Sequence, residues 1–172
     1  MRPVILFIAT SLDGYIARMD GRIDWLFTDQ DYGFREFFSN VDTVVLGRKT
    51  YDVSLSFGEY PYPGRAGYVF SHTRSGQQDE HAQFISTDPA EFIAGLRKKP
   101  GKKIWLVGGS ELVQGFVQAD LIDEYVISIH PLILGAGIPL FRSPLPARKL
   151  VFRDSTTFDS GLVQVSYSRR RA

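Results

Sequence analysis

The chain has 172 residues and a formal net charge of +1, so its size fits one domain and its charge does not call for nucleic acid or an anionic membrane as partner. Its 44% hydrophobic and 13% aromatic residues suffice for a well-filled core and are too many for a disordered segment. It has no cysteine, which excludes thiol catalysis, thiolate metal sites and disulfides and fits a reducing compartment. No apolar segment is long enough to span a membrane. We therefore expect one cytoplasmic domain over residues 1–172.

Short apolar segments rich in valine and isoleucine are typical of strands that are covered on both faces. Such segments cover residues 4–9, 43–46, 67–70, 84–85, 104–107 and 125–134. Helical spacing of apolar residues predicts helices over 32–39, 89–97 and 110–118. Before the helix over 89–97, Asp88 is expected to be the N-cap, and Pro89 suits the first helical position. The alternation of strands and helices indicates an α/β fold with a mostly parallel sheet.

The C-terminal part departs from this alternation. Residues 150–158 and 162–168 form two strand-like segments joined by the short turn over 159–161. Apolar and polar residues alternate over 163–168, which is typical of an antiparallel strand with one wetter face. We expect a mixed sheet that is parallel through most of the chain and ends in an antiparallel hairpin.

The first candidate ligand-binding turn follows the strand over 43–46 and consists of Gly47, Arg48, Lys49 and Thr50. A helix is expected to begin here, and the free N–H groups at a helix start attract anions. Gly47 permits close approach of a ligand to the backbone, while Arg48 and Lys49 add positive charge. An ordinary strand–helix turn with solvated basic residues has the same local sequence, so this turn alone does not decide between the two.

The second turn follows the strand over 104–107 and contains Gly108, Gly109 and Ser110. Two adjacent glycines expose backbone amides to a pyrophosphate, and Ser110 either contacts the ligand or caps the following helix. Two such turns in one small sheet favour a shared site, because ligands of open α/β sheets collect at the carboxyl ends of the strands.

Other signals for nucleotide or metal binding fail. Residues 135–140 begin like a dinucleotide fingerprint but lack its third glycine. His72, His81 and His130 have no metal-ligand spacing, so we expect surface or structural roles for them and no metal site. The loop between Thr10 and Trp25 is either a flap over a ligand or only a wide surface loop.

Together these segments resemble the dihydrofolate reductase superfamily. They are most similar to its branch of riboflavin-biosynthesis pyrimidine reductases and stand-alone relatives. The resemblance covers nearly the whole chain, and the order and spacing of its segments make it specific. The segments are 11–17 (SLDGYIA), 46–51 (LGRKTY), 107–110 (VGGS), 121–125 (LIDEY), 131–137 (PLILGAG) and 139–141 (PLF).

The resemblance implies a three-layer fold, a homodimer, and NADPH bound across the carboxyl ends of the strands. It implies that Arg48 and Arg74 face the 2′-phosphate, which agrees with the preference that two cations would give for NADPH over NADH. The expected cofactor-binding residues are Ala9, Thr10, Ile16, Gly47, Arg48, Lys49, Thr50, Ser71, Arg74, Val107, Gly108, Gly109, Ser110 and Leu112.

The substrate is expected near Asp31, which falls, counting back from Gly47, where dihydrofolate reductases hold a carboxylate against the pterin. A carboxylate there accepts hydrogen bonds from two neighbouring N–H groups and assists protonation. The alternative for Asp31 is a helix N-cap or first-turn acid.

The loop over 11–14 resembles that of the riboflavin-type branch, which disfavours folate as the substrate. We therefore expect hydride transfer from NADPH to a small heterocyclic substrate, most like the 5-amino-6-(5-phosphoribosylamino)uracil reductase step of riboflavin biosynthesis. A dihydrofolate or pterin reductase and a non-catalytic NADPH-binding protein are the alternatives. Arg35 and Arg142 are candidates for holding a substrate phosphate.

Overall fold

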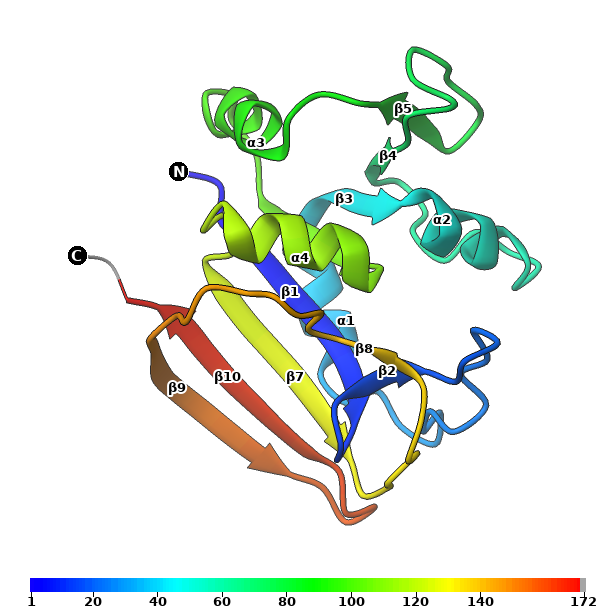
Figure 1. Ribbon diagram of the computed structural model, residues 1–172, viewed down its shortest axis with the longest axis vertical. Helices are drawn as coiled ribbons and strands as arrows, with labels where there is room; N and C mark the ends of the chain where they lie inside the picture. Colours follow the sequence, from blue (N-terminus) through cyan, green and yellow to red (C-terminus); the bar gives the residue numbers. More distant parts are fainter. Residues whose placement is uncertain (171–172) are drawn as a thin grey trace.

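The computed structural model describes residues 1–170, and its centre is an eight-stranded sheet in the order β5-β4-β3-β6-β1-β7-β10-β9 (Figure 1). The six strands from β5 to β7 pair in parallel, whereas β10 runs antiparallel to both β7 and β9. This confirms the predicted mixed, mostly parallel sheet with a closing hairpin. The strands of this sheet are β1 (Val4–Ser11), β3 (Val41–Gly47), β4 (Ala66–Phe70), β5 (Ala82–Ile85), β6 (Lys103–Gly108), β7 (Glu124–His130), β9 (Leu150–Thr157) and β10 (Val163–Arg169).

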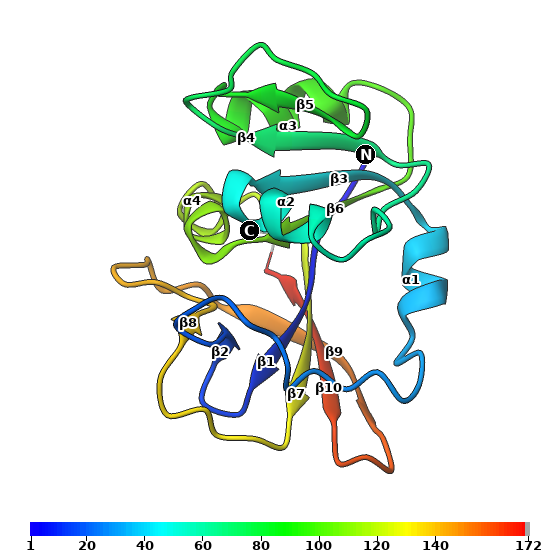
Figure 2. The same ribbon diagram turned by 90° about the vertical axis from the view of Figure 1, so that its right-hand side faces the viewer.

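Within residues 1–170, four helices lie on the two faces of the sheet (Figure 2): α1 (Phe34–Ser39), α2 (Arg48–Leu55), α3 (Pro89–Arg97) and α4 (Ser110–Gln118). Since side chains alternate along a strand, neighbouring residues of β3 and β6 enter different cores. Val45 and Leu106 pack with residues of α3 and α4, whereas Leu46 and Trp105 pack with residues of α1 and α2. The chain thus has one core on each face of the sheet, which gives the three-layer architecture.

A second, two-stranded sheet joins segments that lie far apart in the sequence. It pairs β2 (Tyr15–Ala17) with β8 (Ile138–Pro139) in antiparallel fashion. Next to it, the Asp13 carboxylate accepts hydrogen bonds from the Leu134 and Gly135 N–H groups at 3.1 and 2.8 Å. The loop after β1 and the loop after β7 therefore form one substructure at the carboxyl ends of these strands.

The structure corrects three details of the sequence prediction. The helix expected over 32–39 begins at Phe34, because Tyr32 and Gly33 have φ angles of 50° and 78° and so lie outside the helical region. The strand expected over 125–134 ends at His130, where Pro131 follows and cannot donate to a strand ladder. The antiparallel strand expected over 163–168 is confirmed, but its wetter face is not, since residues 163–167 are all half-buried. This hairpin lies at the sheet edge, while the cores lie mainly over β1 to β7.

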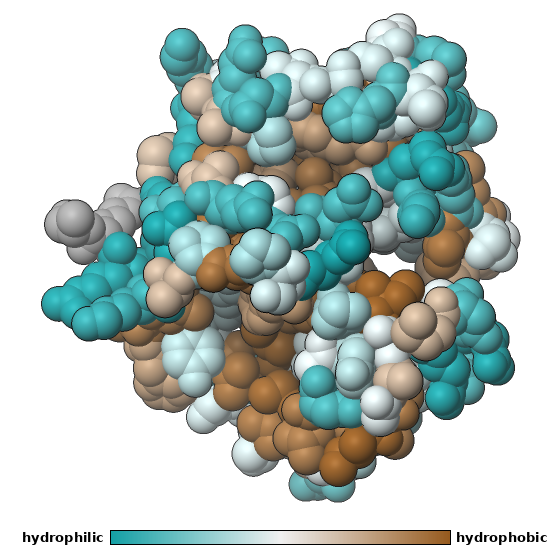
Figure 3. Space-filling model, in the orientation of Figure 1, coloured by the Kyte–Doolittle hydropathy of each residue, from teal (hydrophilic) through white to brown (hydrophobic). Residues whose placement is uncertain are grey.

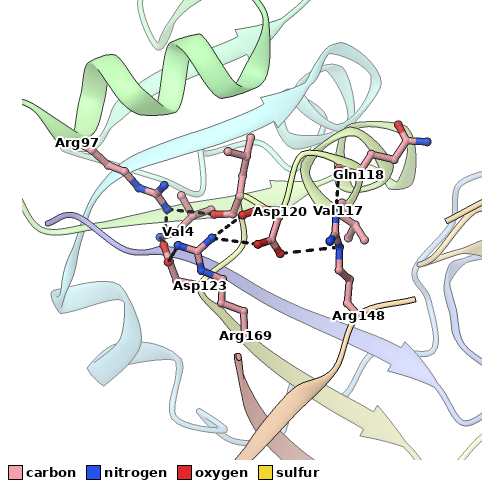
Figure 4. Close-up of polar contacts among 9 residues, drawn as sticks. Val4, Arg97, Val117, Gln118, Asp120, Asp123, Arg148 and Arg169 are labelled. Carbon is pink, nitrogen blue, oxygen red and sulfur yellow. Dashed lines mark hydrogen bonds and ion pairs between the residues drawn. The ribbon is translucent and has the colours of Figure 1, made fainter. Parts of the chain in front are cut away.

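A buried charge network closes the amino end of β1 and β7 (Figure 4). The Asp123 carboxylate, in a residue that is only 6% exposed, contacts Arg97 at 2.6 Å and Arg169 at 3.0 Å and accepts the Val4 N–H at 2.9 Å. Arg169 also reaches Asp120 at 3.5 Å. The network ties α3, β1 and β10 to the segment before β7.

None of the helices within residues 1–170 is both long and apolar enough to cross a membrane.

Candidate functional site

The two glycine turns of the sequence lie against each other. β3 and β6 are neighbours in the sheet, and Leu46 pairs with Gly108 in their register. A Cβ atom on Gly109 would lie 3.0 Å from Thr50 Oγ1, and one on Gly47 would lie 3.5 Å from the Gly109 nitrogen. Gly108 has a φ of 129°, a conformation that favours glycine. The two turns thus form one continuous backbone surface, which is tightest at Gly109.

The helices that follow these turns begin without side-chain caps. Gly47 is the N-cap of α2 and Gly109 that of α4, and neither helix start has a side-chain cap hydrogen bond. The alternative in which Ser110 caps α4 is therefore wrong, and Ser110 is instead the first helical residue. At the start of α3, by contrast, the Asp88 carboxylate accepts the Ala90 and Glu91 N–H groups, as predicted. The first-turn N–H groups of α2 and α4 are thus left for an anion.

A cavity of about 330 Å³ lies at the same edge of the sheet, between the ends of β1 and β7 and the segment over 25–32. Its walls include four aromatic rings, together with Ala9 of β1 and polar groups of Asp31, Ser128 and His130. The aromatic residues are Phe7, Phe27, Tyr32 and Phe34. A concave, mostly aromatic cavity with a few polar groups is typical of a small-molecule site.

The comparisons with known proteins agree with this geometry. Residues 64–164 match the family model described as the RibD C-terminal domain. The uncharacterized protein YwjB of Bacillus subtilis (strain 168) is 42% identical over 172 residues, covering 98% of each chain. The chain belongs to the RibD C-terminal domain family.

Two solved structures are similar to this RibD C-terminal chain. A putative riboflavin biosynthesis protein from Shewanella sp. PV-4 is 34% identical, with a TM-score of 0.88 over 98% of this chain and 99% of that one. Dihydrofolate reductase from Enterococcus faecalis, solved with NADP(H), has a TM-score of 0.73 at 18% identity, covering 98% and 97%. The second likeness shows a shared fold, which confirms the expected dihydrofolate-reductase-like architecture.

In this RibD-type fold, the basic residues expected at the cofactor are held by weak contacts to the protein itself. Arg48 Nη1 donates to Asp52 at 2.8 Å within α2. The Arg74 guanidinium stacks 3.6 Å above the Phe84 ring and lies 3.5 Å from Asp79. Exposed ion pairs of this kind contribute about 0–1 kcal/mol, so either arginine can exchange its carboxylate for a phosphate.

The remaining expected cofactor residues occupy two parts of this edge. Thr10 is buried near the end of β1, Ala9 lines the cavity, and Ile16 lies in β2 beside the core. Ser71 is buried just after β4, and its hydroxyl accepts the Arg74 N–H at 3.2 Å. The structure thus separates a basic part around β3 and β4 from an apolar part around β1.

Asp31 precedes α1 and lines the cavity, so it is not the N-cap or the first-turn acid that the sequence allowed as the alternative. Both of its carboxylate oxygens lie 3.2 Å from the Arg35 nitrogen in the first turn of α1. The N-cap residue itself is Gly33. The Asp31 side chain is 38% exposed, so it stays accessible to a ligand.

His130 was expected to have only a surface or structural role, and sequence reasoning missed that it also lines the cavity. It is 3% exposed, its Nε2 accepts the Phe27 N–H at 3.2 Å, and its Nδ1 lies 3.3 Å from the Ser128 carbonyl oxygen. Burial lowers the pKa of His130, although backbone contacts partly oppose this, so the ring is a neutral Nδ1–H tautomer at pH 7. The sequence signal that could have placed His130 in the site was its position at the carboxyl end of a buried strand, where ligands of α/β sheets bind.

His130 has a structural role in joining the 25–32 segment to β7, where Trp25 also packs edge-on against it at 5.1 Å. Within residues 1–170 no group of three His, Asp or Glu side chains is arranged to hold a metal ion.

Proposed function

We propose that the protein is an NADPH-dependent reductase that transfers a hydride to a small heterocyclic substrate. Its chemistry would be most like the 5-amino-6-(5-phosphoribosylamino)uracil reductase step of riboflavin biosynthesis. The observation that carries this proposal is the contact of two uncapped helix starts at Gly47 and Gly109, on the sheet edge that also holds the aromatic cavity. The structural likeness to a dihydrofolate reductase that binds NADP(H) supports it.

The residues present fit a dinucleotide phosphate. The pyrophosphate would lie on the N–H groups at the starts of α2 and α4, where Gly109 leaves the space that a Cβ would fill. Arg48, Lys49 and Arg74 are the cations for the 2′-phosphate. We propose the full set as Ala9, Thr10, Ile16, Gly47, Arg48, Lys49, Thr50, Ser71, Arg74, Val107, Gly108, Gly109, Ser110 and Leu112.

When bound, NADPH would supply a hydride from C4 of its nicotinamide ring. Ala9 lines the cavity, so a nicotinamide against the end of β1 would face a substrate held there. The surrounding aromatic rings exclude water and fix the orientation of the substrate ring. The Asp31 carboxylate would accept substrate N–H groups and relay a proton from solvent water to the substrate atom that gains the electron pair when the hydride adds.

Cofactor binding is tested by titrating NADPH and NADH while following the fluorescence of Trp25 and Trp105. We expect NADPH to bind more tightly, and Arg48→Ala to reduce the preference about tenfold, which corresponds to one ordinary charge-assisted contact. An unchanged preference in Arg48→Ala would contradict the role of this turn, and no binding at all would contradict the proposed function.

Turnover is tested by the loss of NADPH absorbance with the aminopyrimidine nucleotide and with dihydrofolate. We expect Asp31→Asn to lower kcat by about 100-fold, the lower range for a lost acid–base group, while NADPH binding persists. A pterin reductase is the second candidate, favoured by the carboxylate in an aromatic cavity. NADPH binding without turnover of any heterocycle would indicate a non-catalytic NADPH-binding protein.

We also propose that the single domain over residues 1–172 works in the cytoplasm as a homodimer. The edge strand β9 is exposed along its whole length, with Phe152 57% exposed. Figure 3 shows that apolar side chains also gather near the carboxyl end of β7. Light scattering of the purified protein would give the mass of a dimer, and a monomer at micromolar concentration would contradict the proposal.

A further inference from the structure

We propose that the cavity under the 25–32 segment binds an unphosphorylated planar heterocycle and disfavours the corresponding nucleotide. This choice of substrate class rests on the proposed reductase function for its chemistry. It is carried by the shape and the charge of the cavity wall.

The wall selects for a flat ring. Phe7 and Phe34, with ring centroids 6.3 Å apart, come from β1 and α1, whereas Phe27 and Tyr32, 6.4 Å apart, come from the segment between them. Aromatic rings on several sides favour a planar ligand that stacks on them. The volume of about 330 Å³ lies at the lower end of the usual range for small-molecule sites, which is about 300–1,000 Å³.

The charge of the wall disfavours a phosphate. Among the described residues that line the cavity, Asp31 has the one carboxyl group, and none is a lysine or an arginine. His130 adds no positive charge, since burial lowers its pKa and its Nε2 accepts the Phe27 N–H. A phosphate monoester carries a charge of about −1.5 to −2, and the described residues that line the cavity offer it no lysine or arginine.

The arginines that flank the 25–32 segment in the sequence have carboxylate partners. Arg35, which contacts the lining residue Asp31, has Nε 3.5 Å from that carboxylate and a side chain that is 91% exposed. Arg35 itself is not among the residues that line the cavity. Arg18 and Arg22 of the preceding loop pair with Asp24 and Asp20 at 2.6 and 2.7 Å.

The polar groups of the wall suit a ring with both N–H and carbonyl groups. The Asp31 carboxylate accepts from N–H groups. The Ser128 hydroxyl oxygen accepts from Gln164 Nε2 at 3.0 Å, which leaves its own O–H to donate to a ring carbonyl. Gln164 Nε2 also donates to the Tyr32 carbonyl oxygen at 3.2 Å. Gln164 therefore links Ser128 to Tyr32, another residue that lines the cavity.

The test compares 5-amino-6-(ribosylamino)uracil with its 5′-phosphate, because the pair shares ring and sugar and differs only in the phosphate. NADPH oxidation should give a kcat/KM at least about tenfold higher for the nucleoside, with the difference in KM, as expected for one unfavourable charge contact. Equal values, or a preference for the nucleotide, would overturn the proposal. A nucleotide preference that disappears in Arg35→Gln would assign the phosphate to Arg35 instead.

A charge variant sharpens this comparison. Gln30 also lines the cavity, so Gln30→Arg adds a cation there and should reduce the preference for the nucleoside by several-fold, about threefold to tenfold. Gln78→Arg adds the same charge at the β4–β5 crevice, three or more strands from β1, and should leave the preference unchanged. An equal response of both variants would contradict a local charge effect.

A binding measurement separates failure of this inference from failure of the proposed function. Trp25 packs on His130, a cavity residue, so its fluorescence reports binding of the nucleoside or nucleotide in the absence of NADPH. If NADPH is neither bound nor oxidised, the reductase proposal fails, while tighter binding of the nucleoside still supports the cavity assignment. Tighter binding of the nucleotide, or binding of neither compound, overturns it.

Discussion

The two ends of the parallel strands differ in how their polar groups are paired. At the amino end, the buried Asp123 carboxylate is surrounded by Arg97, Arg169 and a backbone N–H (Figure 4). At the carboxyl end, α2 and α4 begin at Gly47 and Gly109 without side-chain caps. The charged groups at the amino end are thus paired within the protein, whereas the carboxyl end leaves N–H donors for a bound anion. Mutations at the amino end should therefore change stability, and mutations at the carboxyl end should change ligand binding.

The largest expected effect is on stability at the amino end. Asp123→Asn removes the buried carboxylate that the partly buried Arg97 and Arg169 share, and should lower the free energy of unfolding by about 3 kcal/mol, the lower end for a broken buried pair because Arg169 keeps Asp120. Urea denaturation followed by far-UV circular dichroism measures this. Asp120→Asn, at a carboxylate that is 47% exposed, is the matched control and should cost about 0–1 kcal/mol. Equal costs would contradict the comparison, as would loss of NADPH binding in the folded Asp123→Asn protein.

At the carboxyl end, Gly109→Ala should affect binding more than stability. The added Cβ would lie 3.0 Å from Thr50 Oγ1 and narrow the surface between the two turns. We expect NADPH affinity to fall by about tenfold or more. Gly115→Ala is the control in the same helix: its Cβ meets nothing within 4 Å, so it should raise stability by about 0.5–1 kcal/mol and leave binding unchanged. Equal binding by both variants would show that close approach at Gly109 is unimportant.

At the carboxyl ends of the strands, the features that could be predicted from sequence are those set by residues close together in the chain. Asp88 before Pro89 predicts a capped helix, and a valine-rich strand that ends in glycine predicts each open turn. The contact of Asp13 with Gly135 and that of His130 with Phe27 join residues more than a hundred positions apart, and periodicity carries no information on such pairs. The start of α1 was misplaced for a related reason, since helical spacing continues through Tyr32 although its φ is 50°.

His130 gives the site end its own pH dependence. Burial lowers the pKa of the folded-state ring below its ordinary value of about 6.5, so below that pH the unfolded chain binds a proton that the folded protein does not. Stability should therefore fall as the pH decreases from about 6.5, by up to about 1.4 kcal/mol per pH unit from this residue. Denaturation at several pH values measures the slope. His130→Gln keeps an acceptor for the Phe27 N–H and should remove this part of the slope, and an unchanged slope would contradict the assignment.

The smallest expected effect tests whether capping alone distinguishes α3 from α2 and α4. Asp88→Ala removes the acceptor for Ala90 and Glu91 and should cost about 1 kcal/mol of stability without changing NADPH affinity.

The mirror variant is Gly47→Asp, at an N-cap with φ −77° and ψ 153° that a non-glycine residue adopts readily. Its carboxylate would cap α2 from within, so stability should hold or rise while NADPH affinity falls, because the donors are then occupied and a negative charge faces the cofactor. If Gly47→Asp binds NADPH as tightly as the unaltered protein, the open start of α2 is not where the cofactor's phosphates lie, and the α4 start alone must hold them.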